Sequence, residues 1–374
     1  MSKIPISNNP SNATFFENVA RLIEQARAYV GRTANLTMCL TYYEIGRMIV
    51  EEEQGGKERA QYGRSLLKEL SEYLSKRVGK GFSETNLKNA RKFYLVYSPT
   101  IGQALPDELK RKPDSQIRQA LPALSSEPGQ TLLHKNLPFT LSWTHYLILM
   151  RIEDEQERRF YEIEANRQNW TYRQLQRQYN SSLYERLALS RDKQEVFKLS
   201  RNGQTLEKPR DILKDPLVLE FLDLDEKATY SETDLENTII NKLSQFLLEL
   251  GKGFLFEARQ KRFSFNEDHF IVDLVFYNRL LQCYLLIDLK TEKLKHQDLG
   301  QMQMYVNYFD RFVKTAYERP TIGMLLCKEK NDSMVELTLP KDANIYASAY
   351  SLYLPDKALL QRKLAEWVRE YEEL

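Results

Sequence analysis

The chain has 374 residues, 42% of them hydrophobic and 28% charged, which is the profile of a globular protein with two or three domains. Its three cysteines (Cys39, Cys283 and Cys327) lie far apart and form no C-x-x-C, so the sequence implies neither a disulfide framework nor a zinc knuckle. The N-terminus lacks the apolar segment of a signal peptide, and no apolar run approaches the roughly 18 residues of a membrane span, so we expect a cytoplasmic protein without membrane contact.

The formal net charge of +2 conceals an uneven distribution of charge along the chain. The segment 57–118 holds 14 lysines and arginines but only 7 aspartates and glutamates. A solvated helical face is one interpretation of such a segment, and a nucleic-acid-binding surface is the other.

The first hundred residues show the periodicity of helices. Apolar residues recur at helical spacing in Ala34–Glu53, and Gln54-Gly55-Gly56 predicts the end of that helix. A second apolar stripe spans 66–74, and a glycine-containing turn follows at 78–82. Ser83 is then a good N-cap for a third helix.

This third helix, 83–94, follows another helix and a turn, as in helix-turn-helix units, so it is a candidate recognition helix. Its alternative role is a solvated basic helix. The residues expected to face DNA are Asn86, Lys88, Asn89, Arg91 and Lys92.

The middle of the chain alternates between irregular and helical patterns. Six prolines in 98–138 predict a loop or mobile insertion. Helices are expected at 143–151, 155–166 and 171–189. Asn202-Gly203 and Pro209 make 201–215 the best linker candidate.

The last region, 216–374, changes character. An amphipathic helix is expected at 235–250 and a second helix at 297–311. β-rich segments lie around these helices, at 254–256, 270–277, 283–289, 321–327 and 345–354. Helices and strands in this order predict an α/β domain with a mixed sheet.

Two of these strands carry charged residues on otherwise apolar sequence. Asp273 lies inside Ile271–Tyr277, and Asp288 and Lys290 lie two apart in the next strand, so the latter two share a face. An even-length hairpin turn over 278–281 would add Asp273 to that face.

A structural salt bridge of Lys290 with either aspartate is one explanation of these charges. Buried ion pairs rarely contribute enough stability to account for their presence, however. Two carboxylates on adjacent strands suit Mg²⁺, or Mn²⁺, and such an ion can hold a phosphate oxygen and activate water. Lys290 could then orient the water or stabilise charge on the phosphate. We therefore expect Asp273 and Asp288 to be metal ligands.

Asp273 followed by Asp288-Leu289-Lys290 resembles the PD-(D/E)XK nuclease signature, with Val272 in place of its leading proline. The resemblance implies that Glu236, on the helix upstream, is a further catalytic acid. Gln301 and Tyr305, four apart and hence on one helix face, are similar to the Q-x-x-x-Y element of exonuclease-type members.

Longer segments resemble the YhcG-like family of PD-(D/E)XK nuclease-domain proteins. Among them are "YYEIGRMI" (42–49), "GKGFSETNLKNARKFY" (79–94), "DLVFYNRLLQCYLLIDLKT" (273–291) and "GQMQMYVNYFD" (300–310). The resemblance implies a mainly helical, winged-helix-like DNA-binding domain at 1–200 and a linker at 201–215. It also implies a restriction-endonuclease-like domain at 216–374 with a C-terminal helix. Asp288 stands where the family usually has Glu, and the loop 293–298 offers Asp298 alone as an acid for a second metal.

The function expected from the residues and the resemblance is that of a Mg²⁺-dependent deoxyribonuclease in DNA repair, restriction or defence. Its expected partners are DNA and possible further copies of the chain in a homodimer or larger assembly. The alternative is a catalytically silent DNA-binding or interaction module that keeps the nuclease fold. Both endonucleolytic and exonucleolytic cleavage are compatible with these residues.

Overall fold

The computed structural model divides into two compact units, Met1–Glu153 and Asp154–Leu374. The residues that it describes are 10–55, 59–104, 139–190, 193–224, 230–265, 267–340 and 343–372. The predicted domain boundary at 201–215 lies inside the second unit and stays a prediction. None of the described helices is long and apolar enough to cross a membrane.

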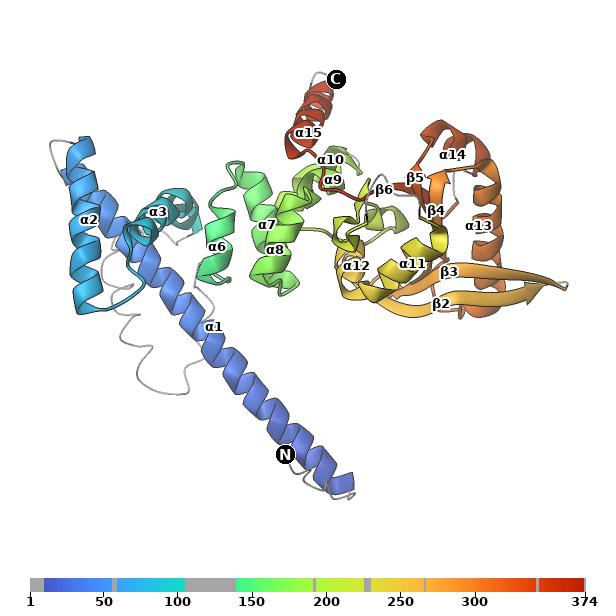
Figure 1. Ribbon diagram of the computed structural model, residues 1–374, viewed down its shortest axis with the longest axis horizontal. Helices are drawn as coiled ribbons and strands as arrows, with labels where there is room; N and C mark the ends of the chain where they lie inside the picture. The colour runs from blue at the N-terminus through green and yellow to red at the C-terminus, as the bar shows by residue number, and fades with distance from the viewer. Residues whose placement is uncertain are drawn as a thin grey trace. The chain divides into compact units, whose positions relative to one another are not determined.

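The described elements of the first unit are all helices: α1 (Pro10–Gly55), α2 (Arg59–Arg77), α3 (Glu84–Ala104) and α6 (Trp143–Leu149) (Figure 1). The loop predicted from residue 98 is wrong for its first seven residues, because α3 runs through Pro99 to Ala104. Phe93 and Tyr97 are buried, and their packing stabilises the helical turns before Pro99. The proline therefore removes one backbone hydrogen bond without ending the helix. The remainder, 105–138, lies outside the described residues, and the winged-helix likeness stays a prediction.

α1 and α3 pack at very close range. A Cβ on Gly46 would lie 2.1 Å from the carbonyl oxygen of Ala90, so only glycine permits this approach. The turn before α3 has Gly79 and Gly81 at positive φ, and the Ser83 hydroxyl accepts a hydrogen bond from the Asn86 backbone at 3.3 Å. The predicted helix, glycine turn, N-cap and helix are therefore confirmed.

The second unit begins with four helices: α7 (Glu155–Arg167), α8 (Tyr172–Asn180), α9 (Leu183–Leu189) and α10 (Lys193–Asn202). The single helix predicted over 171–189 is wrong, because Ser182 has φ +53° and separates α8 from α9. A left-handed residue cannot continue a right-handed helix. The predicted C-terminal helix is α15 (Lys357–Glu372).

A six-stranded mixed sheet forms the centre of this unit, in the order β1-β6-β5-β4-β3-β2. The strand β3 is antiparallel to both of its neighbours, β2 and β4, while β4, β5, β6 and β1 run parallel. Their bounds are β1 (Leu217–Val218), β2 (Phe254–Phe265), β3 (Asp268–Asn278), β4 (Cys283–Lys293), β5 (Ile322–Glu329) and β6 (Ile345–Ser351). The predicted α/β domain with a mixed sheet is confirmed.

Helices cover both faces of the sheet (Figure 1). On one face α11 (Glu232–Asn241) and α12 (Leu243–Leu250) pack on the apolar side chains of β3 and β4. On the other face lies α13 (His296–Tyr308), which a π-helical turn (Phe309–Val313) extends. The predicted continuous helix over 235–250 is wrong, because the backbone leaves helical geometry at Lys242. A short helix, α14 (Asp332–Thr338), precedes β6.

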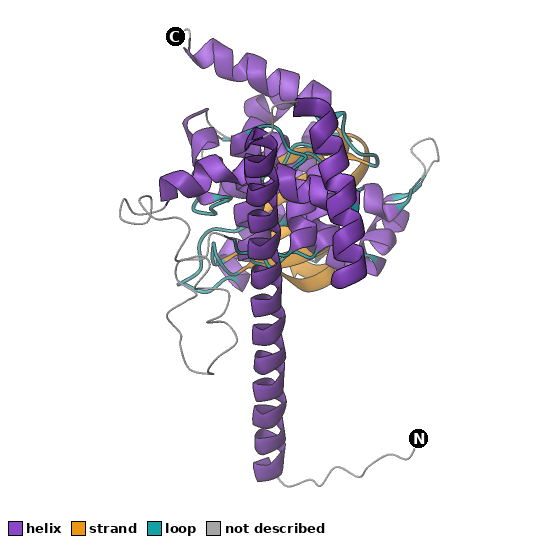
Figure 2. Cartoon of the chain, turned by 90° about the vertical axis from the view of Figure 1, so that its left-hand side faces the viewer, coloured by secondary structure: helices purple, strands orange, loops and turns teal. Residues whose placement is uncertain are grey.

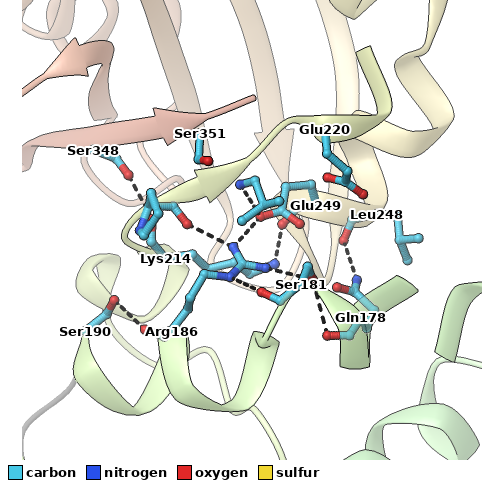
Figure 3. Close-up of polar contacts among 12 residues, drawn as sticks. Gln178, Ser181, Arg186, Ser190, Lys214, Glu220, Leu248, Glu249, Ser348 and Ser351 are labelled. Atoms are coloured by element: carbon cyan, nitrogen blue, oxygen red, sulfur yellow. Dashed lines mark hydrogen bonds and ion pairs between the residues drawn. The ribbon is translucent and has the colours of Figure 1, made fainter. Parts of the chain in front are cut away.

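A buried ionic cluster connects α8 and α9 to α12 and β1 (Figure 3). The Arg186 guanidinium, fully buried, lies 2.5 Å from Glu249 Oε1 and also donates to the carbonyl oxygens of Ser181 and Pro216. Burial alone would raise the pKa of Glu249, but Arg186, Lys214 and Arg177 lower it to about 2. Glu249 is therefore ionised within the core, and its charge is balanced by cations from three segments.

A second buried cluster pairs the first residue of α15 with α7 and α9. Lys357 forms ion pairs with Glu157 and, at 2.8 Å, with Glu185. Burial and repulsion by Glu185 raise the pKa of Glu157 to about 7, against the attraction of Lys357. The folded state therefore keeps a proton on Glu157 at pH values where the unfolded chain has lost it.

This pKa predicts a pH-dependent stability. A raised carboxyl pKa contributes stability that is full below about pH 4.5 and is lost as the pH rises through about 7. Glu157→Gln removes the titration, so the stability of the wild-type protein relative to this variant should fall by about 3 kcal/mol over that range. Urea unfolding of both proteins at a series of pH values measures the difference. Parallel stability curves would contradict the assignment.

Candidate active site

The two aspartates of the candidate site lie on neighbouring antiparallel strands. Leu274 in β3 is opposite Ile287 in β4, and a four-residue turn at 279–282 joins the strands. One further step of this register sets Asp273 opposite Asp288, and opposed residues share a face. The spacing of the sequence thus places both carboxylates together.

Asp273 lies where β3 and β4 cease to pair. The Leu289 backbone N–H donates to Asp273 Oδ2 at 2.8 Å, so the carboxylate replaces a hydrogen bond of the strand ladder. Burial, and then the adjacent Asp288, raise the pKa of Asp273 to about 6. Burial and the Asp288 carboxylate both disfavour ionisation of Asp273, and a bound cation would offset both effects.

Lys290 supplies a positive charge beside these carboxylates. Its Nζ lies 2.9 Å from Asp288 Oδ2 and 3.5 Å from Oε2 of Glu232, in the first turn of α11. Burial would lower the pKa of Lys290, but Asp288, Glu232 and Asp273 together raise it, so the side chain stays protonated. The ammonium is thus held between the sheet and α11, beside the two aspartates.

Glu236 is also part of the group, held by side chains from β2. Arg259 Nε contacts its Oε1, and the Gln260 amide contacts its Oε2. The same amide nitrogen lies 3.2 Å from Asp273 Oδ1, which joins the acid of α11 to the acid of β3. Gln260 has φ +49°, a backbone conformation that non-glycine residues seldom adopt.

The residues missed by the sequence analysis are therefore Glu232, Arg259 and Gln260. The sequence predicted a strand over 254–256 only, whereas β2 extends to Phe265. Arg259 and Gln260 lie in this extension, so they were not assigned to a strand. Only Glu232 left a usable signal in the sequence, because it lies four residues before Glu236 and the two acids therefore share a helix face.

Tyr305 and Gln301 lie on α13, which covers the face of the sheet opposite to α11. Their side chains contact each other, and the Tyr305 side chain is buried. Burial raises the pKa of Tyr305, and Asp288 and Asp273 raise it further. Two other residues of this helix have different surroundings: His296 is exposed, and Asp298 accepts a hydrogen bond from the Lys295 backbone at 2.8 Å.

The candidate DNA-binding residues of α3 differ in their surroundings. Lys88 and Lys92 are exposed, Lys88 with an exposed ion pair to Glu84 at 3.5 Å, and Asn89 is half-buried. Arg91 pairs with Glu53 of α1 at 2.6 Å, and Asn86 donates to the carbonyl oxygen of Gly81. The two lysines are thus the members of the set with charge most available to a phosphate.

The oxygen atoms of the site fit a hard divalent cation in part. Among the described residues, no group of three or more His, Cys, Asp or Glu side chains is arranged to hold a metal ion. Asp288 Oδ2 is buried and receives no hydrogen bond from a described residue beyond its ion pair with Lys290. Asp273 and Asp288 would therefore be two protein ligands, with water and phosphate oxygens completing the coordination.

A mixed sheet with Asp273 on one central strand and Asp288-Leu289-Lys290 on the next has the arrangement of the PD-(D/E)XK nucleases. Residues 210–365 match the YhcG PDDEXK nuclease domain, and residues 18–186 match the DUF1016 N-terminal domain. The chain is 38% identical to the "Putative nuclease YhcG" of Escherichia coli (strain K12) over 364 residues, which are 96% of this chain and 94% of that protein. The chain therefore belongs to the YhcG family of PD-(D/E)XK nuclease-domain proteins.

Two solved structures are similar over about a third of the chain. A repair endonuclease from Pyrococcus abyssi is 17% identical with a TM-score of 0.23, and an EndoMS–double-stranded DNA complex is 15% identical with a TM-score of 0.25. The matches cover 35% and 36% of this chain and half of the length of each of those chains.

Proposed function

We propose that this protein is a metal-dependent deoxyribonuclease that hydrolyses phosphodiester bonds, with Mg²⁺ as its ion and Mn²⁺ as a substitute. The observation that carries the proposal is that Asp273 and Asp288 lie one register step beyond the Leu274–Ile287 pair of adjacent strands, with the Lys290 ammonium 2.9 Å from Asp288. Divalent ions are general in PD-(D/E)XK nucleases, and carboxylate oxygens are the ligands that Mg²⁺ prefers.

The proposed roles follow from the contacts of each residue. Asp273 and Asp288 would hold the ion, which when bound would supply an activated water and polarise the phosphate. The Lys290 ammonium, fixed by Asp288 and Glu232, orients the attacking water or stabilises charge on the phosphate. Glu236 positions Gln260 and Arg259, while Gln301 and Tyr305 line the site from α13.

A cleavage assay tests the proposal. Purified protein is incubated with single-stranded, duplex and branched DNA in Mg²⁺, Mn²⁺ or excess chelator. Cleavage in the presence of an ion and its loss in chelator are expected. DNA binding without cleavage of any substrate under all these conditions would favour the alternative, a catalytically silent DNA-binding or interaction module that keeps the nuclease fold.

We also propose that α3 contributes to the affinity for DNA. Lys88→Ala with Lys92→Ala should weaken binding, and the slope of log affinity against log salt should decrease by roughly one for each lost phosphate contact. Arg91 is left intact because its pair with Glu53 joins α3 to α1. Fluorescence anisotropy in chelator, at several salt concentrations, measures both quantities.

The matched control for this measurement removes two charges from α15 by Arg362→Ala with Lys363→Ala. Both residues are exposed, as Lys88 and Lys92 are. An equal loss of affinity in the two double variants would mean that only the total charge matters. Unchanged affinity and salt slope in the α3 variant would exclude this helix as a DNA contact.

A further inference from the structure

The N-terminal half of α1 has an exposed apolar stripe. Phe15, Val19 and Leu22 follow one another at spacings of four and three residues, and Ala26 and Tyr29 continue the row. A second row, at spacings of seven, lies beside it and consists of Phe16, Ile23 and Val30. Most of these side chains are about half exposed, and Leu22 and Val30 are each 65% exposed. We define these eight residues as the α1 stripe.

The same row is covered further along the helix. Leu36, Leu40 and Tyr43 continue the spacing, and all three are buried in the first unit. Figure 2 shows α1 as one uninterrupted helix, so a single apolar seam is packed in its C-terminal half and exposed in its N-terminal half. Alternate spacings of three and four residues are the pattern of a coiled coil. Helices of this kind derive most of their stability from packing of the apolar face.

We propose that the α1 stripe is a dimer interface that pairs with the same stripe of a second copy of this chain in an antiparallel coiled coil. Antiparallel pairing can set Leu22 opposite Ala26, Val19 opposite Tyr29 and Phe15 opposite Thr33 of the second copy. Each layer then combines a larger side chain with a smaller one, which fills the seam evenly. Parallel pairing would instead place Phe15 against Phe15 and Ala26 against Ala26. Some layers of the seam would then hold too much side-chain volume and others too little.

The area and the charge of the stripe both suit a second copy. The exposed parts of these side chains amount to the order of 700 Å² per copy, if an aromatic residue buries about 150–250 Å² in full. A standard stable interface buries about 800 Å² per partner. The row on the other flank of the seam holds Asn18, Gln25 and Arg32, and the antiparallel register sets position 32 beside Asn18 of the second copy, so pairing brings no like charges together. The charged residues Glu17, Arg21, Glu24 and Arg27 lie on the outer positions of the helix.

Sedimentation velocity of the full chain over a range of concentrations tests the proposal. The wild-type protein should be a dimer, and Leu22→Glu should raise the dissociation constant of the dimer at least 100-fold. The control is Leu337→Glu in α14, the same substitution at a side chain that is 89% exposed; it should dissociate like the wild type. A monomeric wild-type protein up to about 100 µM, or a Leu22→Glu variant that dimerises normally, would overturn the proposal.

Cysteine cross-linking determines the orientation without disturbing the seam. Ile23 lies close to the two-fold axis of the antiparallel pair, so Ile23→Cys should form a disulfide between two copies under mild oxidation. Val19→Cys should not, because its counterpart is about ten residues away along the helix. The native cysteines are buried and do not compete. Cross-linking through Val19→Cys in preference to Ile23→Cys would indicate a parallel pair and would overturn the antiparallel proposal.

Discussion

Asp273→Asn is expected to reduce the rate of DNA cleavage by about 10²–10³-fold or more while leaving the fold intact. The change removes a ligand charge at nearly constant volume, and the remaining side-chain oxygen can still accept from the Leu289 backbone. Because the pKa of Asp273 is already raised to about 6, the neutral asparagine resembles a state that the folded protein tolerates well. Single-turnover cleavage, Mn²⁺ titration and a thermal melt measure rate, metal binding and fold.

Asp268→Asn is the matched control for this experiment, because Asp268 begins the same strand and is exposed. Lys290→Met separates catalysis from a structural role: it should remove cleavage and preserve metal binding, since only the ammonium is lost. If Lys290 served only as a counter-ion for Asp288, the variant would lose stability and retain cleavage on cooling. Equal cleavage rates for Asp273→Asn and the wild type would exclude Asp273 from the site.

The core of the candidate site could be predicted because it depends on strand periodicity. Residues two apart in β4 share a face, and a short even-length hairpin turn transfers that relation to β3. Asp273, Asp288 and Lys290 could therefore be grouped without knowledge of the tertiary structure. Their roles as metal ligands and catalyst stay predictions that the cleavage assays test.

The outer part of the site depends on contacts between elements that are distant along the chain. Gln260 reaches Glu236 and Asp273 only because β2 extends beside β3 with an unusual backbone conformation at that residue. The breaks at Ser182 and Lys242 were missed for a related reason. Both lie in segments with continuous helical periodicity, and only packing decides where such a segment turns.

Arg186→Met is expected to lower the free energy of unfolding of the second unit by about 3–5 kcal/mol. The substitution leaves the Glu249 carboxylate buried with one cation fewer, and deprives the carbonyl oxygens of Ser181 and Pro216 of a donor (Figure 3). Arg177 still contacts Glu249 at 3.1 Å, but its guanidinium also forms an ion pair with Glu220. Urea unfolding followed by circular dichroism measures the loss.

Two further variants distinguish charge burial from lost packing. Arg173→Met changes an exposed arginine of α8 and should alter stability by less than about 0.5 kcal/mol. Arg186→Met with Glu249→Leu removes both charges, and should regain much of the stability because no carboxylate remains unpaired in the core. A double variant that is no more stable than Arg186→Met alone would mean that the hydrogen bonds, and not the ion pair, are what the cluster supplies.

The position of Arg186 also determines which fragments of the chain should be stable. The match to the DUF1016 N-terminal domain ends at residue 186, and the match to the nuclease domain begins at residue 210. Arg186 and Arg177 nevertheless neutralise Glu249, which lies inside the nuclease domain. A fragment that starts at residue 210 lacks both arginines and leaves Glu249 with Lys214 alone. It should therefore unfold at lower urea concentration than a fragment that starts at residue 154, and Glu249→Leu should stabilise the shorter fragment but destabilise the longer one.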